Sequence, residues 1–100
     1  MERVVNTLPS NSTTTTVTAD YAIPFHTGAI FWNGGSTGTL TLPSDVTYYG
    51  ARYDVKNISG NTVVLDPAGA TQIDGAASVS LVTLNWSYTA MFDGTTYRIL

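Results

Sequence analysis

The chain has 100 residues, the length of one domain, and no cysteine, so disulfides and thiolate chemistry are excluded. Only 11% of the residues are charged and the net charge is −3, whereas a soluble domain is usually about one quarter charged. Four scattered cationic residues form no basic patch, which argues against nucleic acid or an anionic membrane as a partner. Thr, Ser, Asn and Gly replace the missing charges, as suits a chain that is buried in a larger protein assembly.

Residues 1–20 are predicted to form an extended N-terminal arm that precedes a β-domain over residues 21–100. The arm contains a polar tract at 10–16 with no apolar face, and Val4, Val5 and Leu8 would anchor it to a neighbouring chain by strand addition. A frayed terminus is the alternative. The sequence has no signal-peptide pattern and no apolar run of about 18–20 residues, so we expect synthesis in a cytoplasm and no membrane partner.

Short strands are expected at residues 22–25, 29–32 and 38–42, because turn residues separate these apolar runs. Pro24 marks the first run as an edge strand, since proline cannot donate a ladder hydrogen bond. Residues 46–50 are expected to form a loop or a single helical turn, the only helix expected from the sequence.

The stretch from Tyr53 to Gly75 alternates short strand-like runs with compact turns at Ser59–Asn61 and Asp66–Gly69. A period of two with turn chemistry between the runs predicts a β-meander. Further strands are expected at 78–84, 85–92 and 95–100, and Asp93–Gly94 is a strong signal for a tight turn between the last two.

The predicted fold class is therefore all-β. We expect a compact antiparallel β-sandwich or barrel-like meander of about eight short strands. The alternation places ten residues in its core: Leu40, Leu42, Val55, Val64, Ile73, Leu81, Trp86, Tyr88, Phe92 and Ile99.

No catalytic, cofactor-binding or metal-binding residue is predicted. His26 is the only histidine, and no nucleophile-elbow motif accompanies it. Asp54, Asp66, Asp74 and Asp93 offer a carboxylate pair for glycoside hydrolysis. However, the last three stand next to proline or glycine, where aspartate is favoured as a turn former.

Two aromatic pairs are candidates for a sugar-stacking platform or a protein anchor: Phe31–Trp32 and Tyr48–Tyr49. Packing inside the fold is the alternative, and for the Tyr48–Tyr49 loop the two readings stay open. Trp86, Tyr88 and Tyr97 are expected in the core.

Residues 40–100 carry an ordered set of motifs: Leu42-Pro43, Val55-Lys56-Asn57, Ser59-Gly60-Asn61, Ile73-Asp74-Gly75 and Phe92-Asp93-Gly94-Thr95. In order and spacing this set resembles the small β-domains of bacteriophage tail fibres, head fibres and decoration proteins. Tyr97 stands where such modules often have tryptophan, and the N-terminal part of the chain matches less well.

The resemblance implies a homotrimer with a non-enzymatic, structural role in the virion. The expected function is capsid decoration (cement) or a head fibre, and the expected partners are further copies of the chain and the major capsid protein or other virion proteins. The alternative is a tail-fibre or spike module that binds host surface glycan, and a polysaccharide depolymerase is a more distant third. The candidate capsid or subunit contacts are Val4, Val5, Leu8, Tyr48 and Tyr49.

Overall fold

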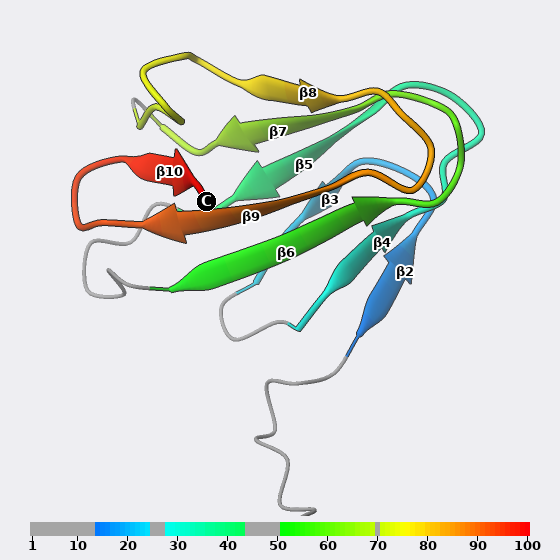
Figure 1. Cartoon of the computed structure of the whole chain (residues 1–100), viewed down its shortest axis with the longest axis horizontal. Coiled ribbons are helices and arrows are strands. Elements are labelled where there is room, and N and C mark those ends of the chain that lie inside the picture. Colours follow the sequence, from blue (N-terminus) through cyan, green and yellow to red (C-terminus); the bar gives the residue numbers. More distant parts are fainter. Residues whose placement is uncertain (1–13, 25–27, 44–50, 70) are drawn as a thin grey trace, which may run out of the picture.

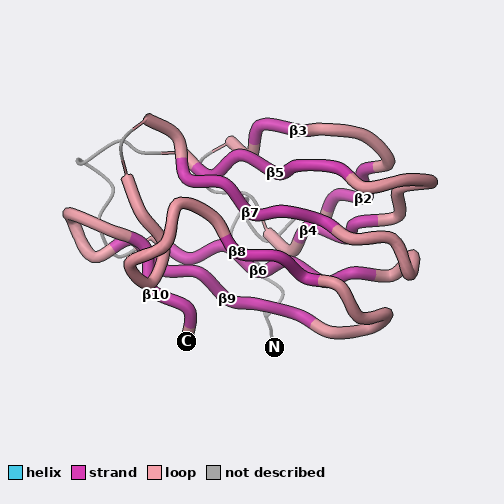
Figure 2. The backbone as a smooth tube through the Cα atoms, turned by 90° about the horizontal axis from the view of Figure 1, so that it is seen from above, coloured by secondary structure: helices cyan, strands magenta, loops and turns pink. Residues whose placement is uncertain are grey.

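Nine strands in two facing sheets form the part of the chain that the computed structural model describes, residues 14–24, 28–43, 51–69 and 71–100 (Figures 1 and 2). The first sheet has the order β10-β9-β6-β4-β2 and the second has the order β3-β5-β7-β8. In chain order the strands are β2 (Thr15–Val17), β3 (Tyr21–Ala22), β4 (Ile30–Trp32), β5 (Gly38–Leu42), β6 (Arg52–Asn57), β7 (Val63–Pro67), β8 (Val79–Leu81), β9 (Ser87–Phe92) and β10 (Tyr97–Ile99). The predicted all-β class is confirmed for these residues.

The first six strands form three stacked coils. In each coil the chain runs along one sheet, crosses to the other sheet and runs back. Strands β2, β4 and β6 are therefore parallel neighbours in the first sheet, and β3, β5 and β7 are parallel neighbours in the second. We call the crossings arch 1 (residues 18–20), arch 2 (33–37) and arch 3 (58–62). This stacking is that of a short β-solenoid.

The second and third coils are equivalent residue by residue. Ile30 pairs with Val55 and Leu42 with Pro67, so the partners stand 25 residues apart at both ends (55 − 30 and 67 − 42). The first coil is shorter. From Val17 to Tyr21 the chain takes four steps, whereas their register partners Trp32 and Leu40 are eight steps apart. The connection from Val17 to Tyr21 is therefore four residues shorter than the corresponding connection from Trp32 to Leu40 in the second coil.

The last three strands close the sandwich with antiparallel pairs, β7 with β8, β6 with β9 and β9 with β10. The antiparallel prediction is confirmed there and wrong for the coils, where all four strand pairs are parallel. Alternation of apolar residues reports only which face is buried, and it is the same in both kinds of sheet. The β-meander predicted for Tyr53–Gly75 is wrong at arch 3, because this arch joins β6 to β7 in the opposite sheet.

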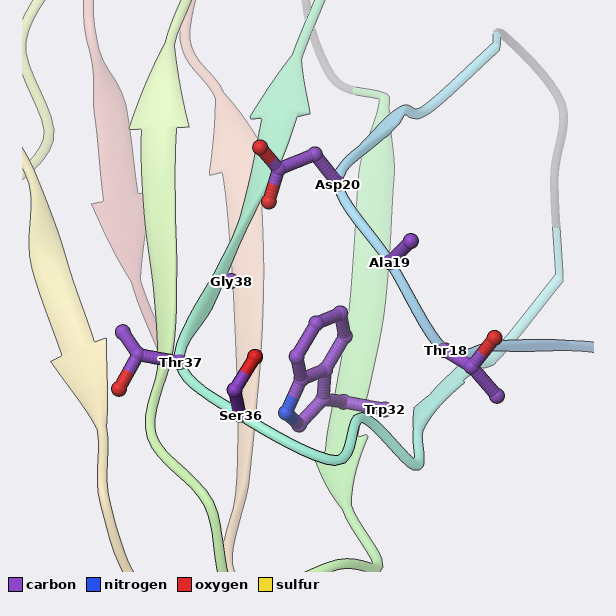
Figure 3. Close-up of a pocket in the computed structure, with 7 residues that line it drawn as sticks. All are labelled: Thr18, Ala19, Asp20, Trp32, Ser36, Thr37 and Gly38. Atoms are coloured by element: carbon purple, nitrogen blue, oxygen red, sulfur yellow. The ribbon is translucent and has the colours of Figure 1, made fainter.

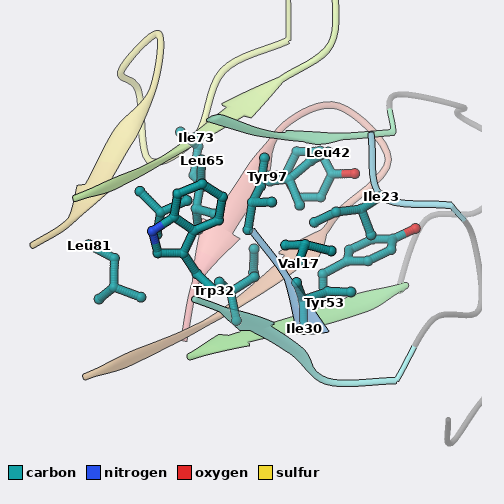
Figure 4. Packing of buried hydrophobic residues seen from close by; sticks show 14 of the residues in the cluster. Val17, Ile23, Ile30, Trp32, Leu42, Tyr53, Leu65, Ile73, Leu81 and Tyr97 are labelled. Atoms are coloured by element: carbon teal, nitrogen blue, oxygen red, sulfur yellow. The ribbon is translucent and has the colours of Figure 1, made fainter. Parts of the chain in front are cut away.

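The space between the sheets is filled by a core to which eight strands contribute buried side chains, while β3 packs the half-buried Tyr21 against it and is followed by buried Ile23 (Figure 4). Of the ten predicted core residues, six are buried: Leu40, Leu42, Val55, Ile73, Leu81 and Phe92. Tyr88 and Ile99 are half-buried and pack against the core. Val64 is wrong, because Val63 and Leu65 provide the core face of β7 and Val64 lies on the opposite face. Trp86 is wrong, because its side chain is 60% exposed. It precedes β9, so the alternation of that strand does not extend to it.

Several strand limits also differ from the prediction. Thr15–Val17 belongs to the fold as β2, with Val17 buried, although these residues were assigned to the arm. The strand predicted to stop before Asp66 continues through Asp66 and Pro67 as part of β7, and Pro67 lies in register with Leu42. Residues 71–73 form only isolated bridges through Ile73.

Candidate interaction surface

The predicted contact residues Val4, Val5, Leu8, Tyr48 and Tyr49 lie outside the described residues, as does His26. Of the other aromatic pair, Trp32 is buried in the core and Phe31 is half-buried on β4. The alternative of packing inside the fold is therefore confirmed for Trp32, so this pair does not form an exposed stacking platform. Tyr97 is buried as predicted.

Asp74 and Asp93 are turn formers, as predicted. The Asp93 carboxylate accepts hydrogen bonds from the amides of Thr95 (3.0 Å) and Thr96 (2.9 Å), and it forms an ion pair with Arg98 at 3.0 Å. The Thr96 and Thr95 amides and the guanidinium lower the pKa of Asp93. Asp74 has a left-handed backbone (φ 50°) and accepts a bond from the Ile99 amide. Both carboxylates are thus engaged in holding backbone.

The Ile73-Asp74-Gly75 turn and the Asp93-Gly94 hairpin pack together at one end of the sandwich. The Asp74 amide donates to the Tyr97 carbonyl at 3.0 Å, and the Tyr97 amide donates to the Gln72 carbonyl at 2.9 Å. These two segments, far apart in the sequence, thus form one structural unit. Asp66 and Asp54 lie away from this unit on exposed strand positions, and Asp54 accepts a bond from the Thr89 hydroxyl.

The opposite end of the sandwich carries the three arches and the connection between β8 and β9 (Figure 1, right). Its central residue is Asn57, which is fully buried at the end of β6. The Asn57 amide group donates to the carbonyls of Asn61 (2.8 Å) and Leu81 (3.0 Å). Its side-chain oxygen accepts from the Ser59 amide at 3.0 Å. One side chain therefore shapes arch 3 and ties it to β8.

Arch 3 is also bonded to arch 2. The Asn61 side chain donates to the Gly34 carbonyl at 2.8 Å, and the Trp32 indole donates to the Asn61 carbonyl at 3.2 Å. The Ser59 hydroxyl accepts from the Asn61 amide within the turn. The Asn57-x-Ser59-Gly60-Asn61 motif thus encodes the arch geometry.

The β8–β9 connection, residues 82–86, exposes three large apolar side chains, and we call it the apolar loop. The exposed fractions are 56% for Val82, 51% for Leu84 and 60% for Trp86. Backbone hydrogen bonds fix the loop to Asn57. The Asn57 backbone N–H donates to the Trp86 carbonyl (2.9 Å), and the Asn57 backbone carbonyl accepts from the Asn85 backbone N–H (2.6 Å). Asn85 is left-handed (φ 68°), a conformation that asparagine tolerates.

A polar depression of about 400 Å³ lies between arches 1 and 2 (Figure 3). It exists because arch 1 is too short to cover the side of arch 2. One oxygen of Asp20 accepts the Thr39 amide at 2.8 Å, which fixes the carboxylate there. The depression is lined by residues of the two arches and their flanks: Thr18, Ala19, Asp20, Trp32, Ser36, Thr37 and Gly38.

Within the described residues, no group of three or more His, Cys, Asp or Glu side chains is placed to hold a metal ion. The same part of the chain contains no helix long and apolar enough to cross a membrane. No protein-family model matches this chain, and no curated protein sequence matches it.

The apolar loop was missed at the sequence level, because Trp86 was assigned to the core and residues 78–84 to a strand. Two signals point to it in retrospect. No charged residue occurs between Asp74 and Asp93. In addition, Asn85 interrupts the apolar run with a residue that favours turns.

Proposed function

We propose that the chain is a bacteriophage virion structural protein, a small homotrimeric capsid decoration (cement) or head-fibre protein that stabilises the particle by protein–protein contacts and has no enzymatic activity. It would be made in the host cytoplasm and reside in the virion. Its partners would be further copies of itself and the major capsid protein or another virion protein.

The observation that carries this proposal is the exposed apolar loop on a rigid support. Large apolar side chains that are held in place and exposed mark protein contact sites. The sparse charge of the chain agrees with such a role. The motifs behind the virion resemblance agree with a structural role, since the side chains of Asn57, Asp74 and Asp93 all bond to backbone within the fold.

The proposed capsid or subunit contacts remain Val4, Val5, Leu8, Tyr48 and Tyr49, and a truncation tests the first three. Because β2 belongs to the fold, the deletion should stop at residue 13 instead of residue 20. The truncated protein should keep its β-sheet circular dichroism and lose co-sedimentation with phage particles that lack the native protein. Unchanged binding to particles would contradict the role of the arm, and failure of the full chain to bind particles would overturn the proposed function.

A glycan-binding tail-fibre or spike module is the second candidate, and the polar depression favours it. Thr18, Asp20, Ser36 and Thr37 offer hydroxyl and carboxylate groups that suit sugar hydroxyls. Saturable binding on a glycan array that is lost in Asp20→Ala would support this candidate. The double variant Tyr48→Ala/Tyr49→Ala tests the loop pair in the same assay. If the protein binds particles but gives no signal on the glycan array, the glycan-binding candidate is rejected.

A further inference from the structure

The apolar loop contains three of the four large apolar side chains that are exposed in the described part of the chain; the fourth is Leu100. Single exposed apolar residues are ordinary on soluble proteins, but a cluster within five residues marks a contact surface. Tryptophan and leucine side chains in such a cluster remove much water-exposed apolar area when a partner covers them.

The loop is already fixed in its exposed form. Asn57 holds it through its backbone amide, its backbone carbonyl and its side-chain amide, which bond to Trp86, Asn85 and Leu81 respectively. The Trp86 amide also donates to the Thr83 carbonyl at 3.1 Å. A partner would therefore bind a preformed knob and would not have to order a flexible segment.

The distribution of charge indicates which partner fits. The chain has a net charge of −3, but the apolar loop, arch 2 and arch 3 contain no charged residue, and the charges that flank them are Asp20 in arch 1 and Lys56, the register partner of Ser87. When a surface packs against its own copy near a symmetry axis, each charge meets a like charge. An uncharged patch avoids this repulsion. A charged protein partner would instead be matched by opposite charges around the loop, and there are none within these three segments.

We propose that the apolar loop is the contact between copies of this chain, in which Val82, Leu84 and Trp86 of neighbouring copies pack together about a symmetry axis. The proposal rests on the assembly part of the proposed function and identifies the surface that forms the assembly.

Trp86 provides a direct readout. The chain has two tryptophans, Trp32 in the core and Trp86 in the loop. Self-association should bury Trp86, so dilution of the wild-type protein should shift its fluorescence to longer wavelength and increase quenching by acrylamide. A Trp86→Phe variant, which retains only the buried Trp32, should show no such concentration dependence.

Sedimentation provides the second measurement. Leu84→Ser/Trp86→Ser should associate at least about 100-fold more weakly than the wild type, because it removes two central apolar contacts. Leu100→Ser is the matched control, since Leu100 is 64% exposed and lies outside the loop. All three positions are exposed, so circular dichroism should show that every variant is folded.

Three results would overturn the proposal: a wild-type protein that is monomeric at every concentration, equal weakening by Leu100→Ser, or a fluorescence shift that appears only when neutral phosphatidylcholine vesicles are added. Particle binding separates this proposal from the proposed function. Monomeric protein that still binds particles contradicts the copy contact alone, whereas an oligomer that depends on the loop but does not bind particles contradicts the virion role alone.

Discussion

Trp32 and Asn57 are register partners on β4 and β6, and each is almost completely buried where its coil turns into an arch. The two coils fill this equivalent position in different ways. At arch 2 the Trp32 indole ring packs against Gly34. At arch 3 the Asn57 side chain instead forms hydrogen bonds with Ser59 and Asn61. The two residues are joined through Asn61, whose carbonyl accepts from both side chains.

Replacement of Asn57 by alanine should strongly destabilise the fold. The change removes the donors to the Asn61 and Leu81 carbonyls and leaves the buried Leu81 carbonyl without that bond. A buried polar group without a partner costs about 1–3 kcal/mol, so the free energy of unfolding in urea should fall by about 3 kcal/mol. Asn33→Ala is the control, because Asn33 is exposed and directly follows Trp32, the register partner of Asn57. It should change the free energy of unfolding by no more than about 0.5 kcal/mol. Similar losses for both variants would contradict the assigned role of Asn57.

The case of Asn57 also explains how far the sequence predicts this fold. Strand Gly38–Leu42 was predicted with its correct limits and faces, because turn residues bound it and its apolar residues alternate. In β6 the same alternation continues through Tyr53 and Val55 to Asn57, a polar residue on the buried face. Composition cannot reveal that burial, since it depends on carbonyls contributed by arch 3 and β8.

The parallel pairing of the coils could not be predicted from the sequence for a related reason. Residues 30–42 and 55–67 repeat the same path at a spacing of 25 residues, but they share few identical residues. Trp32 stands opposite Asn57 and Gly34 opposite Ser59, so the repeat conserves geometry through different contacts. The apolar loop was missed because exposure of Trp86 depends on where β9 begins, which local alternation does not define.

Gly34 and Gly38 should be intolerant of alanine. A Cβ atom at either position would overlap the ring of Trp32, which is buried. Overpacking of this kind typically costs about 1–3 kcal/mol, and we expect both variants to lose about that much stability in thermal or urea unfolding. Gly35→Ala is the matched control, since a Cβ there meets no atom within 4 Å. That variant should be neutral or slightly stabilised. Equal tolerance at all three glycines would contradict the packing of Trp32 in arch 2.

Tyr53 and Tyr97 should respond in opposite ways to the loss of their hydroxyl groups. Their rings form an edge-on contact with centroids 6.1 Å apart. The Tyr97 hydroxyl donates to the Pro43 carbonyl, whereas the buried Tyr53 hydroxyl has no hydrogen-bond partner among the described residues. Tyr97→Phe should therefore lower the free energy of unfolding by about 1–2 kcal/mol. Tyr53→Phe should leave it unchanged or raise it by up to about 1 kcal/mol. Equal losses in the two variants would show that Tyr53 has a partner.

Alkaline pH should unfold the protein through the same two phenols. Burial raises the pKa of both Tyr53 and Tyr97, and the proximity of Tyr53 adds to the shift for Tyr97. The unfolded chain releases these protons near pH 10, while the folded chain retains them. The unfolded state therefore binds fewer protons above about pH 10, and the stability falls as the pH rises.

Each phenol contributes a slope of at most about 1.4 kcal/mol per pH unit in that range. Melting temperatures between pH 8 and pH 12, taken as roughly the window around the ordinary tyrosine pKa, should decline steeply for the wild type and less steeply for Tyr53→Phe. Tyr53→Phe/Tyr97→Phe should be the least sensitive of the three. Ultraviolet absorbance of tyrosinate in the wild type and the double variant provides a separate check, because the two buried phenols should ionise only as the fold is lost. A parallel decline in all three proteins would assign the alkaline transition to other groups.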